Sequence, residues 1–327
     1  MTLIMTHSTL LLGIDGGGSK THAVLADESG RVLGTGAAGA SNYQYVGEDR
    51  ATGEINAAIA RAFVEAGIAP RPADYACFGF GGADTPQELS KMDGWVCRFE
   101  WAVRYLVTND GLLPLYAACP DGCGMSVVAG TGSIMWAQAN DGRIARASGW
   151  GYLLGDEGSG YTLGSEALRH IMRAEDGRGP KTALTARVLN HWRLRDTQEL
   201  VLHLYARQLL PSEVADLARV LLGCAEDGDG VALGIARAGA GELAQAAAAT
   251  TRGVNLRPPI VLAYTGSLLI KSGLYRALFA EAVLAHIGEV ELRAVEMPVM
   301  GAVAGARLLQ SGFLATARNE WHIVGRC

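Results

Sequence analysis

The N-terminal part of the chain alternates short apolar runs, typical of buried strands, with segments whose apolar residues recur at helical spacing. Glycine-containing turns separate the first three apolar runs, and longer polar loops separate the later ones. The predicted strands are residues 10–14, 22–26, 31–36, 75–84 and 105–108, and the predicted helices are residues 51–67 and 111–118. This alternation predicts an α/β protein.

The rest of the chain starts with another glycine-rich pair of strands and then becomes helical. Residues 125–149 repeat the strand, turn and strand pattern of the N-terminus, and residues 258–264 form a continuous apolar run typical of a buried strand. Proline and glycine at 120–122 mark a hinge between two domains, 1–122 and 123–302. The predicted helices are residues 159–174, 183–191, 197–209, 212–224, 230–249 and 300–310.

Composition narrows the possible functions. The chain has 327 residues, 49% of them apolar, and 28 basic against 33 acidic residues, a net charge of -5. That balance creates no basic field, so a nucleic-acid partner is not expected. The six cysteines form no CxxC pair, which favours reduced thiols in the cytoplasm. No run reaches the roughly 18 apolar residues of a membrane helix, so no membrane partner is expected.

The stretch GIDGGGSK, residues 13–20, suggests a phosphate-binding loop of unusual type. It fails the Walker A pattern in both registers, because Ser19 stands in the lysine position or Ile14 in a glycine position. A dinucleotide-binding loop must open a helix, whereas the segment that follows is extended. The sequence therefore predicts a β-hairpin with a glycine and hydroxyl tip.

Such a tip can still bind phosphate, because glycines let several backbone N–H groups converge on one anion. Asp15 at the end of the first strand would repel a nucleotide unless a cation lies between them. We therefore expect Mg²⁺ at Asp15, held through water. An ordinary glycine-rich hairpin without a ligand is the alternative interpretation.

A second hairpin shares this plan. MSVVAGTGS, residues 125–133, is again an apolar strand entering a glycine and hydroxyl turn, and it lies about 115 residues after the first copy. Two such units predict a duplicated α/β fold in which the tips face each other across a cleft and hold a triphosphate.

Six stretches carry a resemblance to a known family. In this order along residues 13–273, the stretches are GIDGGGSKT, GASN, VTND, AGTGS, GWGYLLGDEGSG and AYTGSLLIKSG. The chain resembles the N-acetylglucosamine kinase branch of the sugar kinase/actin/heat-shock chaperone superfamily, which also includes the benzoyl-CoA reductase ATPase-type proteins. The resemblance implies a duplicated ribonuclease H-like fold, the fold of actin-like ATPases, with two lobes around an interdomain ATP cleft. It further implies that a C-terminal helix within 303–327 returns to the first lobe, and that the protein is a homodimer.

The candidate base is Asp110, which ends the apolar strand that contains VTND. Ligands of open α/β sheets bind beyond the carboxyl ends of strands. From the residues alone, Asp110 could equally be the N-cap of the following helix. The resemblance implies a general base that takes the proton from a sugar hydroxyl.

The candidate sugar-binding residues come from GASN, AGTGS and GWGYLLGDEGSG. Asn42 offers a hydrogen-bond donor and an acceptor, although it could simply be a turn residue. Capping of the next helix could be the whole role of Asp156. The resemblance implies sugar contacts for Asn42, Ser133, Gly149, Trp150, Gly151, Tyr152, Leu153 and Asp156.

The candidate ATP-binding residues lie on the two hairpin tips and on a third loop, after the strand at 258–264. Thr265 stands where similar proteins often have a second glycine, which weakens the inferred adenosine contacts. The set is Gly17, Gly18, Ser19, Lys20, Thr21, Thr131, Gly132, Gly266, Ser267 and Ser272.

The expected activity is ATP- and Mg²⁺-dependent phosphorylation of N-acetylglucosamine or glucosamine at the 6-hydroxyl. The alternative is an ATPase activator of a 2-hydroxyacyl-CoA dehydratase or benzoyl-CoA reductase system, which needs a cysteine-held iron–sulfur cluster. Cys119 and Cys123, the only close cysteine pair, are expected to be ordinary buried or hinge residues. A sugar-sensing regulator is disfavoured, because the glycine loop at residue 13 leaves no room before it for a DNA-binding domain.

Overall fold

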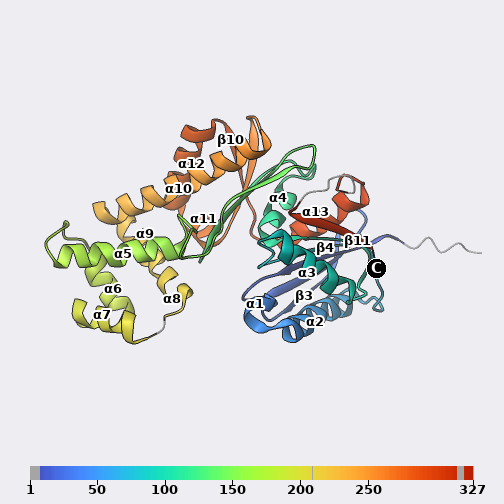
Figure 1. The fold of residues 1–327 in the computed structure, drawn as a ribbon, viewed down its shortest axis with the longest axis horizontal. Coiled ribbons are helices and arrows are strands. Elements are labelled where there is room, and N and C mark those ends of the chain that lie inside the picture. The colour runs from blue at the N-terminus through green and yellow to red at the C-terminus, as the bar shows by residue number, and fades with distance from the viewer. Residues whose placement is uncertain (1–7, 208, 315–319, 327) are drawn as a thin grey trace, which may run out of the picture. The chain divides into compact units, whose positions relative to one another are not determined.

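The computed structural model describes residues 8–207, 209–314 and 320–326 (Figure 1). The chain divides into two compact units. Unit 1 consists of Met1–Ser126, Ala137–Ile144 and Met297–Cys327, and unit 2 consists of Val127–Trp136 and Ala145–Glu296. Among the described helices, none has the length and apolar character needed to cross a membrane.

Unit 1 is built on a six-stranded mixed sheet with the strand order β11-β5-β4-β1-β2-β3. Strand β1 pairs antiparallel with β2 and parallel with β4, and β4 pairs parallel with β5. The strands are β1 (Leu10–Gly16), β2 (Thr21–Asp27), β3 (Val32–Ala38), β4 (Ala73–Phe80), β5 (Ala102–Asn109) and β11 (His322–Arg326).

Helices cover both faces of this sheet because β1 and β4 are apolar on both faces. Leu12 and Ile14 share a core with residues of α2 and α3, whereas Gly13 faces α13. A Cβ at Gly13 would lie 2.7 Å from the Val303 backbone nitrogen, so glycine lets the helix approach. The helical segments are α1 (Tyr43–Val46), α2 (Glu48–Ala66), α3 (Pro86–Cys97), a 3-10 turn η1 (Asp110–Leu112), α4 (Leu113–Ala118) and α13 (Val299–Gln310).

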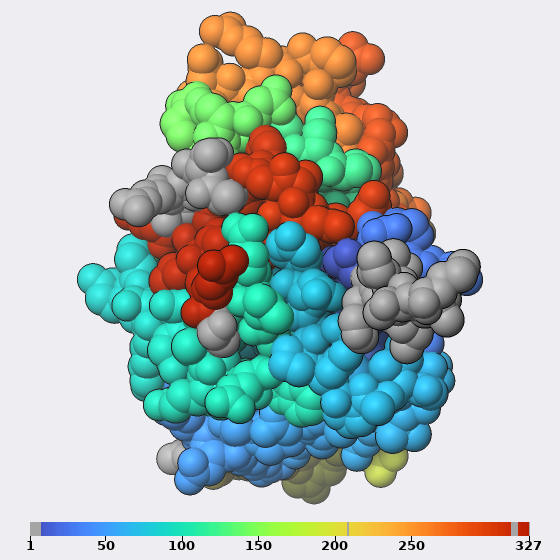
Figure 2. Space-filling model, turned by 90° about the vertical axis from the view of Figure 1, so that its right-hand side faces the viewer, coloured from blue at the N-terminus to red at the C-terminus, as the bar shows by residue number. Residues whose placement is uncertain are grey.

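The C-terminal segment completes unit 1. Helix α13 packs on β1 and β4 and against α4. Strand β11 pairs antiparallel with β5, with His322 opposite Thr108, so the red C-terminal residues lie beside blue-green ones in Figure 2. Residues more than 200 positions apart therefore form neighbouring strands of one sheet.

The second sheet has the order β10-β9-β6-β7-β8, and the helices from α5 to α12 belong to unit 2. The long helix α10 packs on α5, α9 and α12 (Figure 1). The strands are β6 (Gly124–Ala129), β7 (Ser133–Gln138), β8 (Ile144–Ser148), β9 (Ile260–Thr265) and β10 (Val290–Ala294). The helices are α5 (Gly160–Glu175), α6 (Leu184–Trp192), α7 (Thr197–Ala206), α8 (Pro211–Ala215), α9 (Leu217–Glu226), α10 (Gly230–Val254), α11 (Ser267–Lys271) and α12 (Gly273–Ile287).

Both predicted hairpins are present, as β1–β2 and β6–β7. The single helix expected over 212–224 is wrong, because the helical pattern is interrupted at Asp216 between α8 and α9. Helix α3 was not predicted, although its start carries a clear signal. Thr85 accepts a hydrogen bond from the Glu88 N–H and Pro86 occupies the first turn, an arrangement typical of helix N-termini.

Candidate functional site

The unit 1 part of the candidate site lies at the carboxyl ends of β1, β4 and β5. In the parallel register Asp15 is opposite Gly79, and Phe80 is opposite Asn109. Parallel strands present their carboxyl ends at one edge of the sheet, where open α/β folds bind ligands. The register therefore brings Asp15 and the residue after β5, Asp110, to the same edge.

Gly81, just after β4, is the point around which three predicted site residues converge. A Cβ at Gly81 would lie 3.0 Å from Asp110 Oδ2, 3.6 Å from Gly17 Cα and 3.7 Å from Asn42 Nδ2. The structure thus brings Asp110, Asn42 and the first glycine loop together. The sequence analysis did not select Gly81; its FGFGGAD context after an apolar strand was the available signal.

The first glycine loop is held by its own backbone. The Gly17 N–H donates to the Lys20 carbonyl oxygen (3.0 Å), and the Gly17 carbonyl oxygen accepts from the N–H groups of Ser41 and Asn42 (3.1 Å each). Residues 18–20 are exposed, as a ligand-binding tip requires.

Thr21 occupies a different position from the rest of this tip. Its side chain is fully buried, and its hydroxyl donates to the Gly39 carbonyl oxygen (2.7 Å) and hydrogen bonds with the Ser41 hydroxyl (2.7 Å). In this structure Thr21 therefore ties the loop to the segment that carries Asn42.

Asp110 is not the cap of the following helix. Asn109 is the N-cap of η1, because its side-chain oxygen accepts from the Gly111 N–H (2.8 Å). The Asn109 amide also donates to the Ala83 carbonyl oxygen (3.2 Å) and to Asp84 Oδ1 (3.0 Å). The capping role that the sequence left open for Asp110 thus belongs to its neighbour.

The electrostatics of this edge favour protonated carboxyl groups. Burial first, and then the negative charges of Asp15 and Asp84, together raise the pKa of Asp110 from its ordinary value of 3.8 to about 7. Burial alone raises the pKa of Asp15 to about 6. A pKa near the operating pH is the most effective value for a general base.

In unit 2, the AGTGS turn between β6 and β7 meets the loop after β9. Gly266 has φ +91°, and a Cβ there would lie only 2.3 Å from the Ala129 carbonyl oxygen. The Gly130 N–H donates to the Gly132 carbonyl oxygen (2.9 Å), and the Gly130 carbonyl oxygen accepts from the Gly160 N–H (2.8 Å). The two predicted ATP loops therefore pack backbone against backbone.

A cavity of about 460 Å³ opens beside these loops, within unit 2. Three predicted ATP-binding residues, Thr131, Ser267 and Ser272, line it; Ser272 is also the N-cap of α12. The far wall comes from α8 and α9, which the sequence analysis treated only as structural. The lining residues are Gly130, Thr131, Gly160, Ser212, Ala215, Asp216, Arg219, Leu222, Gly223, Glu226, Ser267, Leu268, Lys271 and Ser272.

The predicted sugar loop, residues 149–156, is attached to the AGTGS turn. A Cβ at Gly132 would lie 2.6 Å from Asp156 Oδ2, and the buried Ser133 hydroxyl donates to the Glu157 carbonyl oxygen (2.8 Å). Asp156 has φ +57°, and the N-cap of α5 is Ser159 rather than Asp156. Ser133 and Asp156 thus lie together at the base of the loop.

The tip of this loop exposes large side chains. Trp150 is 63% exposed and Leu153 is 78% exposed. Tyr152 lies against the Tyr161 ring, with centroids 4.8 Å apart. The exposed indole offers a flat apolar surface of the kind that binds a sugar ring.

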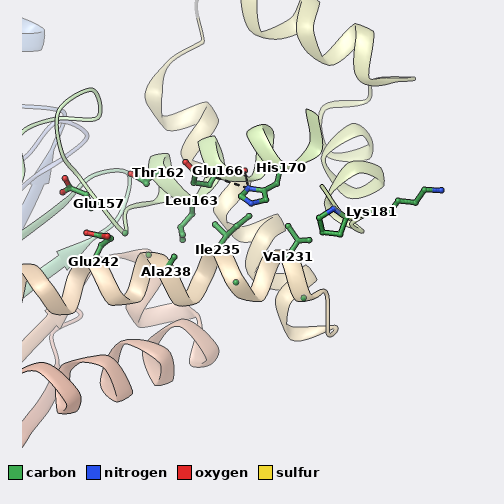
Figure 3. Close-up of a pocket in the computed structure, with 15 residues that line it drawn as sticks. Glu157, Thr162, Leu163, Glu166, His170, Lys181, Val231, Ile235, Ala238 and Glu242 are labelled. Carbon is green, nitrogen blue, oxygen red and sulfur yellow. Dashed lines mark hydrogen bonds and ion pairs between the residues drawn. The ribbon is translucent and has the colours of Figure 1, made fainter. Parts of the chain in front are cut away.

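A second, larger cavity of about 900 Å³ lies between α5 and α10 (Figure 3). Leu163 and Ile235 contribute to its apolar wall, and Glu157 and Glu242 lie at one end while Lys181 lies at the other. Glu157 and Gly158, which directly follow the sugar loop, also line this cavity.

The two cysteines of the alternative hypothesis lie near the end of α4. Cys119 is buried as the C-cap of α4, and its carbonyl oxygen accepts from the Gly122 N–H (2.8 Å). Cys123 is half-buried, and burial together with the charge of Asp121 raises the pKa of its thiol.

Comparison with known proteins identifies the family. The model of the BadF/BadG/BcrA/BcrD ATPase family matches residues 12–309. The chain belongs to the BadF/BadG/BcrA/BcrD ATPase family. The matched range includes both glycine turns, Asp110 and the loop after β9.

Two curated proteins that are similar to this chain are sugar kinases by name. It is 31% identical over 233 residues to the N-acetylmuramic acid/N-acetylglucosamine kinase of Clostridium acetobutylicum, covering 71% of this chain and 76% of that protein. It is 29% identical over 306 residues to the N-acetyl-D-glucosamine kinase of Dictyostelium discoideum, covering 90% and 96%.

A solved structure supports the fold assignment of this ATPase family member. A candidate N-acetylglucosamine kinase from Chromobacterium violaceum superposes with a TM-score of 0.69 at 28% identity, over 92% of this chain and 98% of that one. The predicted α/β fold, that of the actin-like ATPases, is thereby confirmed.

Proposed function

We propose that this protein is an ATP-dependent hexosamine kinase that phosphorylates the 6-hydroxyl of N-acetylglucosamine, or of glucosamine. The observation that carries the proposal is the Asp110 carboxylate, which is held beside Gly17 and Asn42 with a pKa raised to about 7. The names of the two curated relatives and of the superposed structure support an amino-sugar substrate.

Asp110 acts as the general base in this proposal. A sugar hydroxyl is a weak nucleophile until its proton is withdrawn as the oxygen attacks the γ-phosphorus. An ionised carboxylate with a pKa near 7 is a stronger base than an exposed one, and it is still largely ionised at a slightly alkaline pH. Asn42 orients sugar hydroxyls beside that base in this proposal. Its Nδ2 atom and Asp110 Oδ2 would lie 3.7 Å and 3.0 Å from the same point, a Cβ built at Gly81.

Unit 2 supplies the nucleotide site. The cavity of about 460 Å³ is within the size range of small-ligand pockets, and it borders the glycine turn and the N-terminus of α11. Backbone N–H groups of the turn at 130–132 are suited to phosphate oxygens, while Arg219, Leu222 and Gly223 are suited to the nucleoside end.

The residues at the edge of the first sheet fit a magnesium ion. Asp15 and Asp110 are half-buried carboxyls whose raised pKa values a nearby cation would lower. Magnesium keeps several waters and binds one or two carboxylates plus phosphates, so Asp15 would hold it. The ion would neutralise charge on the phosphates.

The alternative function is that of an ATPase activator of an acyl-CoA dehydratase or reductase, and the family is named for its ATPases. The exposed Trp150 loop and the placement of Asn42 beside Asp110 favour a sugar acceptor over electron transfer. Purification under anaerobic conditions separates the two hypotheses: a brown, iron-containing dimer would support the activator.

A coupled ADP-release assay over a panel of hexoses and hexosamines tests the proposal. We expect turnover with one amino sugar, loss of nearly all of it in Asp110→Asn, and normal turnover in the exposed control Asp141→Asn. ADP release that is equally fast without sugar would contradict the kinase assignment. Light scattering tests the homodimer, which stays a prediction.

A further inference from the structure

The sugar loop leaves β8 through a sharply bent backbone. Ser148, the last residue of β8, has φ +61°, followed by Gly149 at +70° and Gly151 at +82°. This left-handed region is unfavourable for a non-glycine residue, because its Cβ comes too close to the backbone. The bend must therefore be stabilised by contacts around it.

One arginine supplies three of those contacts. From β8, Arg146 Nε donates to the Ser148 carbonyl oxygen (3.2 Å) and Nη2 donates to the Gly149 carbonyl oxygen (3.0 Å). Its guanidinium carbon also lies 4.1 Å from the centroid of the Trp150 ring. A planar guanidinium can make both hydrogen bonds and stack on an indole at once, which an ammonium cannot do.

The other side of the bend is held by Glu157. The Ser148 hydroxyl donates to Glu157 Oε2 (2.8 Å), and the Glu157 carbonyl oxygen accepts from the Ser133 hydroxyl (2.8 Å). Ser148 is thus fixed through its carbonyl by Arg146 and through its hydroxyl by Glu157. These contacts join the loop to β8 on one side and to the AGTGS turn on the other.

We propose that Arg146 is a positioning residue of the sugar site, which preorganises residues 148–151 and covers one face of the Trp150 indole. The inference rests on the proposed sugar-kinase function. Because the guanidinium occupies one face of the exposed indole, the acceptor sugar stacks on the opposite face. Arg146 contacts neither sugar nor nucleotide in this proposal, so it sets affinity for the acceptor through loop order.

The first test needs no substrate. Amide hydrogen exchange of residues 148–155 is measured in the wild-type protein, Arg146→Met and Arg146→Lys. The matched control is Arg143→Met, because Arg143 lies just before β8 and its side chain forms an ion pair with Asp141 (2.8 Å). We expect exchange about tenfold faster in Arg146→Met, partial rescue by lysine, and no change in the control. Equal exchange in Arg146→Met and wild type would overturn the proposal.

The second test distinguishes a positioning role of Arg146 in the sugar site from a general contribution to the stability of the fold. In Arg146→Met we expect the KM for the acceptor sugar to rise about tenfold or more, with the KM for ATP within twofold of wild type. Equal rises in both KM values together with a lower melting temperature would show a structural role only. If the wild type shows no sugar-dependent turnover, the proposed function fails, while the exchange experiment still decides whether Arg146 orders the loop.

Discussion

Replacing Asp110 with asparagine should make the protein inactive but more stable, and the gain should grow with pH. The carboxyl has a folded pKa of about 7 against an ordinary value of 3.8, a difference of roughly three units. At about 1.4 kcal/mol per unit, ionising Asp110 in the folded protein costs about 4 kcal/mol. Asparagine has nearly the same shape and never carries this charge.

The sign follows from proton binding. Between pH 3.8 and about 7 the folded state holds the Asp110 proton more tightly than the unfolded state does. Stability contributed by this group is complete below pH 3.8, falls as pH rises, and is fully lost above about pH 7. Asp110→Asn lacks that loss. The unfolding free energy of Asp110→Asn minus that of the wild type should therefore increase by about 3 kcal/mol from pH 5 to pH 8.

Urea unfolding followed by circular dichroism at pH 5, 6, 7 and 8, in EDTA and without nucleotide, measures this difference. The control Asp141→Asn removes an exposed carboxyl whose pKa is lowered by hydrogen bonds to Arg143, so it should show no gain at high pH. A difference between Asp110→Asn and wild type that stays constant within about 1 kcal/mol across this range would refute the reasoning.

Three further predictions concern activity and the nucleotide loops. The kcat/KM for sugar should rise with pH through an apparent pKa near 7, because Asp110 must be ionised to accept a proton; a flat profile would argue against this base. Gly266→Ala should destabilise the protein by about 2 kcal/mol or more in thermal unfolding, because the new Cβ would clash with the Ala129 carbonyl oxygen. The control Gly228→Ala, which has φ +90° but open space around the Cβ, should lower the free energy of unfolding by only about 1 kcal/mol. Arg219→Ala should raise the KM for ATP about tenfold without changing that for sugar, as initial rates would show.

The elements with strong local signals were predictable. The strand at Leu10–Gly16, the helix at Glu48–Ala66 and the two glycine hairpins are set by apolar spacing and by turn residues within a few positions. Short elements without such patterns were missed, including β10 and β11. Strand β11 is stable because it pairs with β5, so nothing within its own five residues is sufficient to predict it.

The candidate site shows the same division. The sequence by itself determined the candidate residues: a carboxylate at a strand end, glycines at hairpin tips and an aromatic loop stand out by local pattern and residue type, and the family resemblance supplied their expected roles. Only the tertiary structure decided that Asn109 rather than Asp110 caps the turn, that Thr21 is buried, and that Arg146 supports the loop. Hydrogen-bond partners, burial and the pKa of Asp110 depend on distances between segments far apart along the chain, which residue spacing does not encode.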